Sequence, residues 1–224
     1  MNKPGSVFSI LKEDQPIAGC TISRDLLPDA KGMAIVFSLG AGTDISPETY
    51  RQNKLIWVID GDLTIHTDQK EDVCLTASDV CWTEKNVPTG TETEKDAIYI
   101  EFAPGDTESM NLNPVPGEVF KLADLVPYKN GSIVNRDVFS TPGMKLVVMS
   151  FDEGTGLSEH AAPGEALLFG LEGEATITYE GVDHVLHAGE EILFAKNGLH
   201  AVQANGPFKM ALLMCLEPKP LFQK

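Results

Sequence analysis

The sequence predicts an all-β protein built from two similar modules, each a small sandwich or barrel. Two observations support this. Many short segments are apolar or alternate between apolar and polar residues, and they end at Gly, Asp, Asn or Pro. The chain also repeats itself at an offset of 112 residues. Helical periodicity is nearly absent, so helices are not expected to form the core.

The expected strands are rich in β-branched and aromatic residues, which suit a pleated, half-buried surface. In chain order they cover residues 54–61, 62–67, 96–103, 144–151, 165–173, 174–181 and 209–216. Residues 44–54 and 119–127 are each expected to hold at most a turn or two of helix. Short strands at this density, with a Gly-Asp or Gly-Glu turn in the middle of each module, are typical of a small sandwich or barrel.

The repeat begins with the sequence PGSVF at residues 4–8, which returns as PGEVF at residues 116–120. Further matches at the same offset pair Arg24-Asp25 with Arg136-Asp137, Ser46 with Ser158 and Gly61 with Gly173. Because the matches keep their order along the chain, they predict one module written twice. We expect the modules to be residues 1–112 and 113–224, divided in the Pro-rich stretch that follows residue 111.

Composition and charge indicate a soluble protein that binds neither nucleic acid nor membrane. Apolar residues make up 42% of the chain and charged residues 22%, ordinary values for a globular protein with a full core. The net charge is −16, and both halves are acidic. This charge would repel nucleic acid and anionic membranes, and solubility is its simplest explanation.

The chain ends and the cysteines favour a cytoplasmic location. The N-terminal residues contain no apolar core of the length that a secretory signal needs, and no apolar run reaches the roughly 18 residues of a membrane span. Cys20, Cys74, Cys81 and Cys215 form no CxxC pair. We therefore interpret them as buried thiols in a reducing compartment.

Four of the five histidines lie in the second module, where two motifs stand out. The stretch GTGLSEHAAPGEALLFGLEG, residues 154–173, resembles the first sequence motif of the cupin superfamily. His160 takes the place of that motif's second histidine and Glu165 that of its glutamate, while Ser158 stands where the first histidine is expected.

The stretch GEEILFAKNGLHAV, residues 189–202, resembles the second cupin motif. It has His200 in the ligand place, with Ala195 and Asn197 in place of the motif's Pro and Gly. The resemblance implies a double-stranded β-helix, or jelly-roll barrel, in each half. The expected fold is therefore two tandem cupin barrels, a bicupin of the RmlC-like type.

The resemblance also implies a metal site in the second module, with His160, Glu165 and His200 as ligands. Two imidazoles and a carboxylate suit one divalent transition metal, whether Fe, Zn, Ni, Mn or Cu. In the first module the aligned positions carry Glu48, Asn53 and Thr89. None is a histidine, so metal ligands are expected to be absent there and the role of that module to be structural.

Strand alternation suggests which residues would form a substrate pocket beside the metal. Residues two apart on an extended strand share a face, so Ser158 and His160 are expected to point the same way. Alternation along the next strand directs Leu167, Phe169 and Leu171 into the barrel. Ser158 and Phe169 are the candidate pocket residues.

The leading hypothesis for function is a metal-binding bicupin acting on a small oxygen-rich metabolite such as a hydroxy acid, keto acid or sugar acid. Its reaction would be of the isomerase, lyase or dioxygenase type. The alternative is a non-catalytic small-molecule-binding protein or sensor, and a third reading is a scaffold or dimerisation module. The fold alone does not select among them. The identity of the metal, the substrate and the oligomeric state, a homodimer included, stay open at this point.

Overall fold

The computed structural model describes residues 2–27, 29–30, 33–67, 71–105 and 112–216. Within these residues the regular structure is strand, apart from α1 (Ile10–Glu13) and the 3-10 turn η1 (Leu122–Leu125). The all-β prediction is confirmed. The expected helical turn at 119–127 corresponds to η1, but residues 44–49 form a strand instead. In the described part of the chain, no helix has both the length and the apolar character needed to cross a membrane.

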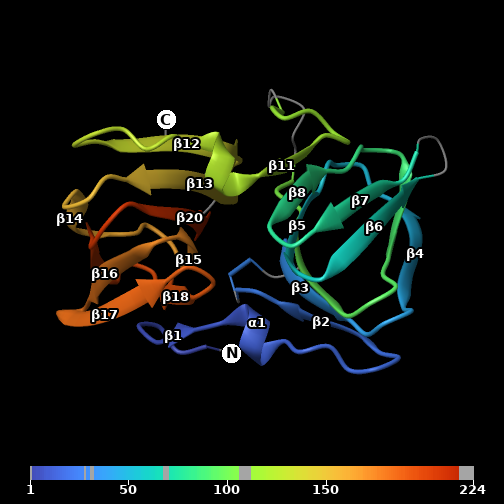
Figure 1. Ribbon diagram of the computed structural model, residues 1–224, viewed down its shortest axis with the longest axis horizontal. Coiled ribbons are helices and arrows are strands. Elements are labelled where there is room, and N and C mark those ends of the chain that lie inside the picture. Colours follow the sequence, from blue (N-terminus) through green and yellow to red (C-terminus); the bar gives the residue numbers. More distant parts are fainter. Residues whose placement is uncertain (1, 28, 31–32, 68–70, 106–111, 217–224) are drawn as a thin grey trace, which may run out of the picture. The chain divides into compact units, whose positions relative to one another are not determined.

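The chain divides into two compact units (Figure 1). Residues 10–122 form one unit, called here the N-terminal barrel, and residues 1–9 with 123–224 form the other, the C-terminal barrel. Each contains one six-stranded and one four-stranded sheet, and every strand pair is antiparallel.

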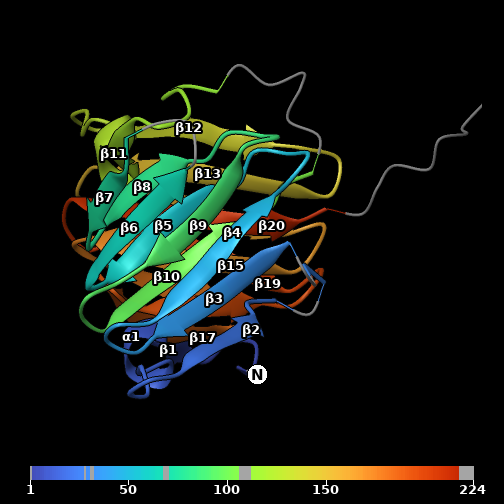
Figure 2. The same ribbon diagram turned by 90° about the vertical axis from the view of Figure 1, so that its right-hand side faces the viewer.

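In the N-terminal barrel the six-stranded sheet has the order β11-β8-β5-β10-β3-β2. Its strands are β2 (Thr21–Asp25), β3 (Ala34–Leu39), β5 (Leu55–Asp60), β8 (Asp79–Trp82), β10 (Ala97–Phe102) and β11 (Val119–Lys121). The four-stranded sheet has the order β4-β9-β6-β7, and Figure 2 shows these strands side by side. They are β4 (Asp44–Thr49), β6 (Asp62–Thr67), β7 (Val73–Thr76) and β9 (Pro88–Glu92).

In the C-terminal barrel the six-stranded sheet has the order β1-β18-β15-β20-β13-β12. Its strands are β1 (Val7–Phe8), β12 (Ile133–Ser140), β13 (Met144–Phe151), β15 (Ala166–Glu172), β18 (Glu191–Phe194) and β20 (Phe208–Cys215). The four-stranded sheet has the order β14-β19-β16-β17. It is made of β14 (Gly156–Ala161), β16 (Glu174–Tyr179), β17 (Val182–His187) and β19 (Leu199–Ala204).

The two barrels therefore have the same strand order in both sheets, which is the jelly-roll arrangement expected from the cupin resemblance. In each barrel the core lies between the two sheets. The C-terminal core combines Phe151, Leu168 and Phe208 of the larger sheet with Ile177 and Val202 of the smaller one. Burial of these apolar faces against each other is the main force that holds the sheets together.

The first strand of each sequence repeat belongs to the barrel that the other repeat forms. β1, from PGSVF, pairs with β18, and Gly5 N donates a hydrogen bond to Leu193 O (2.8 Å). β11, from PGEVF, pairs with β8. The units thus differ from the predicted modules, 1–112 and 113–224, at both edges.

Several strands of the larger sheets are buried on both faces. In β15 every residue from Ala166 to Phe169 is at most 1% exposed. Only Ala166 and Leu168 belong to the core between the sheets. The inward face is therefore the opposite of the one predicted from Leu167 and Phe169. The alternation could not be read because both faces are apolar, as is usual for strands covered on both sides.

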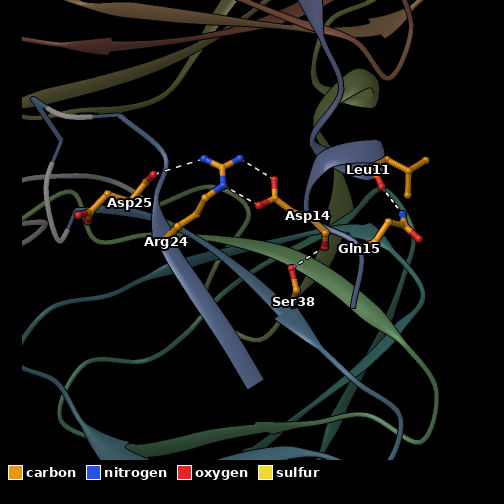
Figure 3. Close-up of polar contacts among 6 residues, drawn as sticks. All are labelled: Leu11, Asp14, Gln15, Arg24, Asp25 and Ser38. Carbon is orange, nitrogen blue, oxygen red and sulfur yellow. Dashed lines mark hydrogen bonds and ion pairs between the residues drawn. The ribbon is translucent and has the colours of Figure 1, made fainter. Parts of the chain in front are cut away.

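The segment around α1 is tied to the N-terminal barrel by one arginine (Figure 3). Arg24 on β2 donates from Nε and Nη2 to the two carboxylate oxygens of Asp14, each at 2.5 Å, and from Nη1 to the carbonyl of Asp25 at 3.4 Å. Ser38 on β3 donates to the Asp14 carbonyl at 2.6 Å. These contacts fix the chain where it enters the barrel, because a two-pronged arginine–carboxylate pair is both strong and directional.

The four cysteines are free, and two of them differ from the expected burial. Cys81 and Cys215 are buried, whereas Cys20 and Cys74 are exposed. Burial raises the pKa of the Cys81 thiol to about 11, so this thiol stays protonated at neutral pH.

Candidate functional site

Two of the three predicted ligands lie next to each other in the C-terminal barrel. His160 on β14 and His200 on β19 are directly paired across the small sheet, and their ring centroids are 4.3 Å apart. His200 is 3% exposed, while His160 is exposed to solvent. Since Val202 and Ala204 on the same strand are core residues, the alternation of β19 turns His200 toward the inside of the barrel.

Backbone carbonyls set the tautomer of both rings. His160 Nδ1 lies 2.8 Å from Ser158 O, and His200 Nδ1 lies 3.0 Å from Gly198 O. A carbonyl oxygen only accepts, so in each ring Nδ1 carries the proton and the neutral ring keeps its lone pair on Nε2. Neither Nε2 has a hydrogen-bond partner within the residues that the structure describes. The site therefore presents two free imidazole acceptors.

Aromatic side chains hold His200 in place. The Phe194 ring stacks on His200 at 4.2 Å with an interplanar angle of 12°, and Tyr179 stacks on Phe194 at 5.5 Å. Burial lowers the pKa of His200, and the neighbouring His160 lowers it further. Its hydrogen bond to Gly198 O opposes these effects. His200 is therefore neutral at physiological pH, the state in which its Nε2 can accept a hydrogen bond or bind a cation.

Glu165, the third predicted ligand, is not gathered with the two histidines. It stands just before β15, and its carbonyl accepts a hydrogen bond from Cys215 N (2.9 Å). The next residue, Ala166, belongs to the core between the sheets. Because side chains alternate along a strand, Glu165 is directed to the face of the sheet opposite to that of Ala166. Across the described ranges, no group of three or more His, Cys, Asp or Glu side chains is arranged to hold a metal ion.

The two predicted pocket residues lie apart from the histidine pair. A bulge in β14 lies between Leu157, which pairs with Val202, and His160, which pairs with His200. Because one residue is added on this strand, the parity changes across the bulge. Leu157 packs on the core and Ser158 is exposed, so Ser158 and His160 do not share a face in the way expected. Phe169 is buried outside the core between the sheets.

These residues do not fit a resident metal held by protein ligands alone. Catalytic zinc sites commonly have three protein ligands, and non-haem iron sites two histidines and a carboxylate. The described site supplies two nitrogens. One feature does resemble a metal site, since metal-binding histidines usually donate their other ring N–H to a carbonyl or carboxylate.

The N-terminal barrel has a different chemistry at the same positions. Glu48 and Thr89 are paired beside a bulge in β4, as His160 and His200 are beside the bulge in β14. The sequence alignment of Glu48 and Thr89 with the two histidines therefore agrees with the strand register. Asn53 is buried and donates to the carbonyl of Thr83 at 2.8 Å.

Sequence reasoning missed Tyr179 and Phe194, which support the histidine pair. Tyr179 is paired with His200 across the sheet, and its hydroxyl accepts a hydrogen bond from Ala195 N at 3.3 Å. Both could have been found from alternation: Tyr179 follows Ala175 and Ile177 on the inward face of β16, and Phe194 ends the short apolar strand before the second motif.

Comparisons with known proteins support the fold. The sequence model of the cupin domain matches residues 147–216. A comparison with curated proteins gives no match. The structure is similar to a cupin 2 conserved barrel domain protein from Leptotrichia buccalis, with 22% identity, a TM-score of 0.81, and 96% of this chain and 98% of that chain covered.

It is also similar to salicylate 1,2-dioxygenase from Pseudaminobacter salicylatoxidans, at 12% identity and a TM-score of 0.58, over 82% of this chain and 71% of that one. A structure of the same dioxygenase with gentisate gives 12% identity and a TM-score of 0.59, over 81% and 67%. At these identities the likeness concerns the fold. The chain therefore contains a cupin domain at residues 147–216, and both of its units have the jelly-roll strand order of the cupin fold.

Proposed function

We propose that the protein is a small-molecule-binding bicupin and that its C-terminal barrel captures a small oxygen-rich metabolite at the histidine pair. The observation that carries the proposal is the pair of free Nε2 acceptors on His160 and His200. Two imidazole rings side by side, each with a lone pair on Nε2, can accept hydrogen bonds from two hydroxyl groups of one ligand. A hydroxy acid or a sugar acid offers such groups.

The surroundings of the pair suit this role. His160 is exposed and His200 is buried against Phe194, so a ligand would enter from the solvent side and contact an apolar wall. Ligand sites commonly combine an apolar lining with a few fixed polar groups. The similar dioxygenase structure with gentisate, a small hydroxylated acid, is in line with a ligand of this kind.

A second candidate function is a metal-dependent reaction on the same class of metabolite. It is favoured by the Nδ1–H groups that both rings donate to carbonyls, the orientation common to metal-bound histidines. A divalent transition metal would bind weakly to two nitrogens, and its remaining positions would need oxygen donors from the metabolite. If so, the metal would act as a Lewis acid on the bound oxygens, as in isomerases, lyases or dioxygenases.

The test measures ligand binding to metal-free protein by calorimetry, with D-glycerate and D-gluconate, which both carry more than one hydroxyl group, as first probes and with Fe²⁺ or Zn²⁺ added in a second series. The variant His160→Gln removes one imidazole at an exposed position. We expect it to weaken binding by roughly twofold to tenfold, because a hydrogen bond between neutral groups contributes about 0.5–1.5 kcal/mol. His184→Ala, which changes a histidine on β17 outside the pair, is the matched control and should bind as the wild type does.

The titrations with added metal distinguish the two candidate functions. Binding without metal supports the first, and binding only with metal, together with turnover or O₂ uptake, supports the second. Binding that is unchanged in His160→Gln, with or without metal, contradicts both. Elemental analysis of protein purified without added metal gives an independent measure of the second candidate.

A further inference from the structure

The N-terminal barrel contains a cavity between its sheets, of about 490 Å³ when the open space at its mouth is included. Its lining includes Phe37, Ile45, Lys54, Thr91, Tyr99 and Glu101. These residues come from β3, β4, β9 and β10 and from the residue just before β5. The cavity lies beside Thr89, the position that corresponds to His200 in the other barrel.

A buried ion pair lines this cavity. Lys54 Nζ is 2.8 Å from Glu101 Oε1, and the two side chains are 8% and 15% exposed. The same ammonium lies 3.0 Å from the centroid of the Tyr50 ring. The Tyr50 hydroxyl donates to Glu48, and burial together with that carboxylate raises the pKa of Tyr50. Removing two charges from water costs several kcal/mol per ion, so such a pair adds little stability by itself.

The other barrel shows that the fold does not need this pair. The β5–β10 ladder has a bulge beside Tyr99, and the β15–β20 ladder has one beside Gly170. When the two ladders are aligned at these bulges, Glu101 takes the same place as Leu212, and Lys54 takes the same place as Ala166. The C-terminal barrel therefore fills the two positions with apolar residues in the same strand arrangement. A structural role alone does not account for the charges in the N-terminal barrel.

The ion pair keeps hydrogen-bonding capacity that faces the cavity. An ammonium has three donors, and the ion pair with Glu101 Oε1 is the one contact of Lys54 Nζ with an oxygen atom within the described residues. The second oxygen of Glu101 has no hydrogen-bond partner there. Thr91 Oγ1 and the Tyr99 hydroxyl are 3.2 Å apart, and one of the two protons remains free for a third group. The cavity thus offers donors and an acceptor close together.

Charge and shape then restrict the ligand. Among the residues that the structure describes, Lys54 is the one cation in the lining, whereas Glu84 and Glu101 also line the cavity and the Tyr50 hydroxyl donates to Glu48. The excess of carboxylates disfavours an anion. The rings of Phe37 and Tyr99 stack at 4.9 Å with an interplanar angle of 9°, which adds a flat apolar wall. Adjacent donors and acceptors beside such a wall suit a ligand with several hydroxyl groups and no charge.

We propose that the N-terminal barrel is a second ligand-binding site, organised by the buried Lys54–Glu101 pair, for a neutral polyhydroxylated molecule such as a monosaccharide or polyol. Hydroxyl groups of the ligand accept from Lys54 Nζ and donate to the free oxygen of Glu101. Its C–H face packs on the Phe37–Tyr99 wall. This site needs no metal and is separate from the histidine pair of the C-terminal barrel.

The experiment uses saturation-transfer NMR and thermal shift on the full chain. The probes are D-glucose, D-galactose, D-mannose, D-xylose, L-arabinose, D-glucitol and myo-inositol, each tested to concentrations well above about 1 mM. D-gluconate and D-glucosamine are the charged counterparts, and they are compared in the His160→Gln variant so that the histidine pair of the other barrel does not contribute. We expect at least one neutral probe to bind more tightly than its charged counterparts, and Lys54→Met to weaken its binding at least about tenfold.

Lys54→Met alone leaves Glu101 buried without its partner, which destabilises the barrel, so a second variant is needed. Lys54→Met with Glu101→Leu removes both charges and restores an apolar pair like that of the other barrel, which is often neutral for stability. It should fold and fail to bind. The matched control is Lys209→Met with Glu172→Leu, since Lys209 also pairs with a glutamate (3.2 Å) and lies over a tyrosine ring but does not line this cavity.

The control should bind the neutral probe as the wild type does. Absence of binding for every neutral probe overturns the proposal. So does binding that persists in the Lys54–Glu101 double variant, or that is lost equally in the Lys209–Glu172 control. His160→Gln should leave this binding unchanged, so that failure here and failure of the function proposed for the C-terminal barrel are told apart.

Discussion

At the scale of single residues, the two barrels use the same places for different chemistry. By strand register, the positions held by His160, Ala162, Ala166 and His200 in one barrel are held by Glu48, Tyr50, Lys54 and Thr89 in the other. One barrel therefore presents two imidazole Nε2 atoms as acceptors, and the other an ammonium paired with a carboxylate. This difference is the basis on which we propose two ligand sites with different preferences.

The histidine pair could be predicted from the sequence, but Glu165 and Lys54 could not be assigned in the same way. The spacing of the motifs leads directly to His160 and His200. The orientation of Glu165 depends on which face of β15 lies inward, and that information is lost because both faces are apolar. Lysine is seldom fully buried, so composition gives no reason to expect Lys54 inside a barrel.

A prediction at this scale concerns His66 on β6. Its Nδ1 lies 2.8 Å from a carboxylate oxygen of Asp72, and its Nε2 lies 2.9 Å from a carboxylate oxygen of Glu92. The bond to Asp72 is the main cause of its raised pKa. The folded state therefore holds the proton more tightly than the unfolded chain does. The resulting stability is present below the unfolded pKa of about 6.5 and is lost as the pH rises through the folded value.

His66→Gln is accordingly expected to lower the free energy of unfolding at pH 5.5, by less than about 1 kcal/mol because the three side chains are partly exposed. Near pH 9 this pH-dependent difference should vanish. Urea unfolding at both pH values measures it. A loss that is larger at high pH than at low pH would contradict the assigned sign.

At the scale of elements, strands and turns were predicted better than the faces of the strands. Short apolar segments ending at Gly located β5, β15 and β16. The bulges in β4 and β14 could not be predicted from the local sequence. In a bulge, two residues of one strand lie opposite one residue of its partner, and no particular residue type marks the extra one. The bulge in β14 is the reason why Ser158 was assigned to the wrong face.

The turns of the C-terminal barrel give a prediction at this scale. Gly173, between β15 and β16, has φ +74°, and a Cβ there would lie 2.1 Å from Pro207 O. Gly181, between β16 and β17, has φ +77° and nothing within 4 Å of such a Cβ. Both Ala variants place a Cβ on a left-handed backbone, which costs about 1–2 kcal/mol of stability. Gly173→Ala must also move the backbone at Pro207, so it should cost at least about 1 kcal/mol more than Gly181→Ala.

Chemical denaturation of the two variants at one pH measures this difference. Equal losses of stability would mean that the backbone near Pro207 can move without an energetic cost. The close approach of Gly173 to Pro207 would then not explain why a glycine stands there.

At the scale of the whole molecule, the number of barrels and their class were predicted, and the limits of the barrels were not. The repeat in the sequence led to two jelly rolls, and an internal duplication remains the interpretation of that repeat. The boundaries between the two barrels instead follow residues 9 and 122. A repeat shows which residues of the two copies are equivalent. It does not show whether a strand pairs with a strand of its own copy or with the equivalent strand of the other copy.

The reciprocal placement of the first strands gives a prediction for hydrogen exchange on the full chain. Val7→Pro with Phe8→Pro removes two backbone donors from β1, and amide protection should fall in its partner β18 while β8 is unaffected. Val119→Pro with Phe120→Pro in β11 is the mirror experiment, and protection should fall in β8 but not in β18. Loss of protection within the mutated strand's own repeat would contradict the pairing.

This pairing also has a consequence for the order in which the barrels form during synthesis. The strand that completes the N-terminal barrel, β11, is made directly after the rest of that barrel, so the barrel can close once residue 122 has emerged. β1 is made first, yet its partner β18 follows about 180 residues later. Closing a loop of that length carries a larger entropic cost and slows folding. The C-terminal barrel is therefore expected to be the slower one to fold, with β1 unpaired until β18 has been translated.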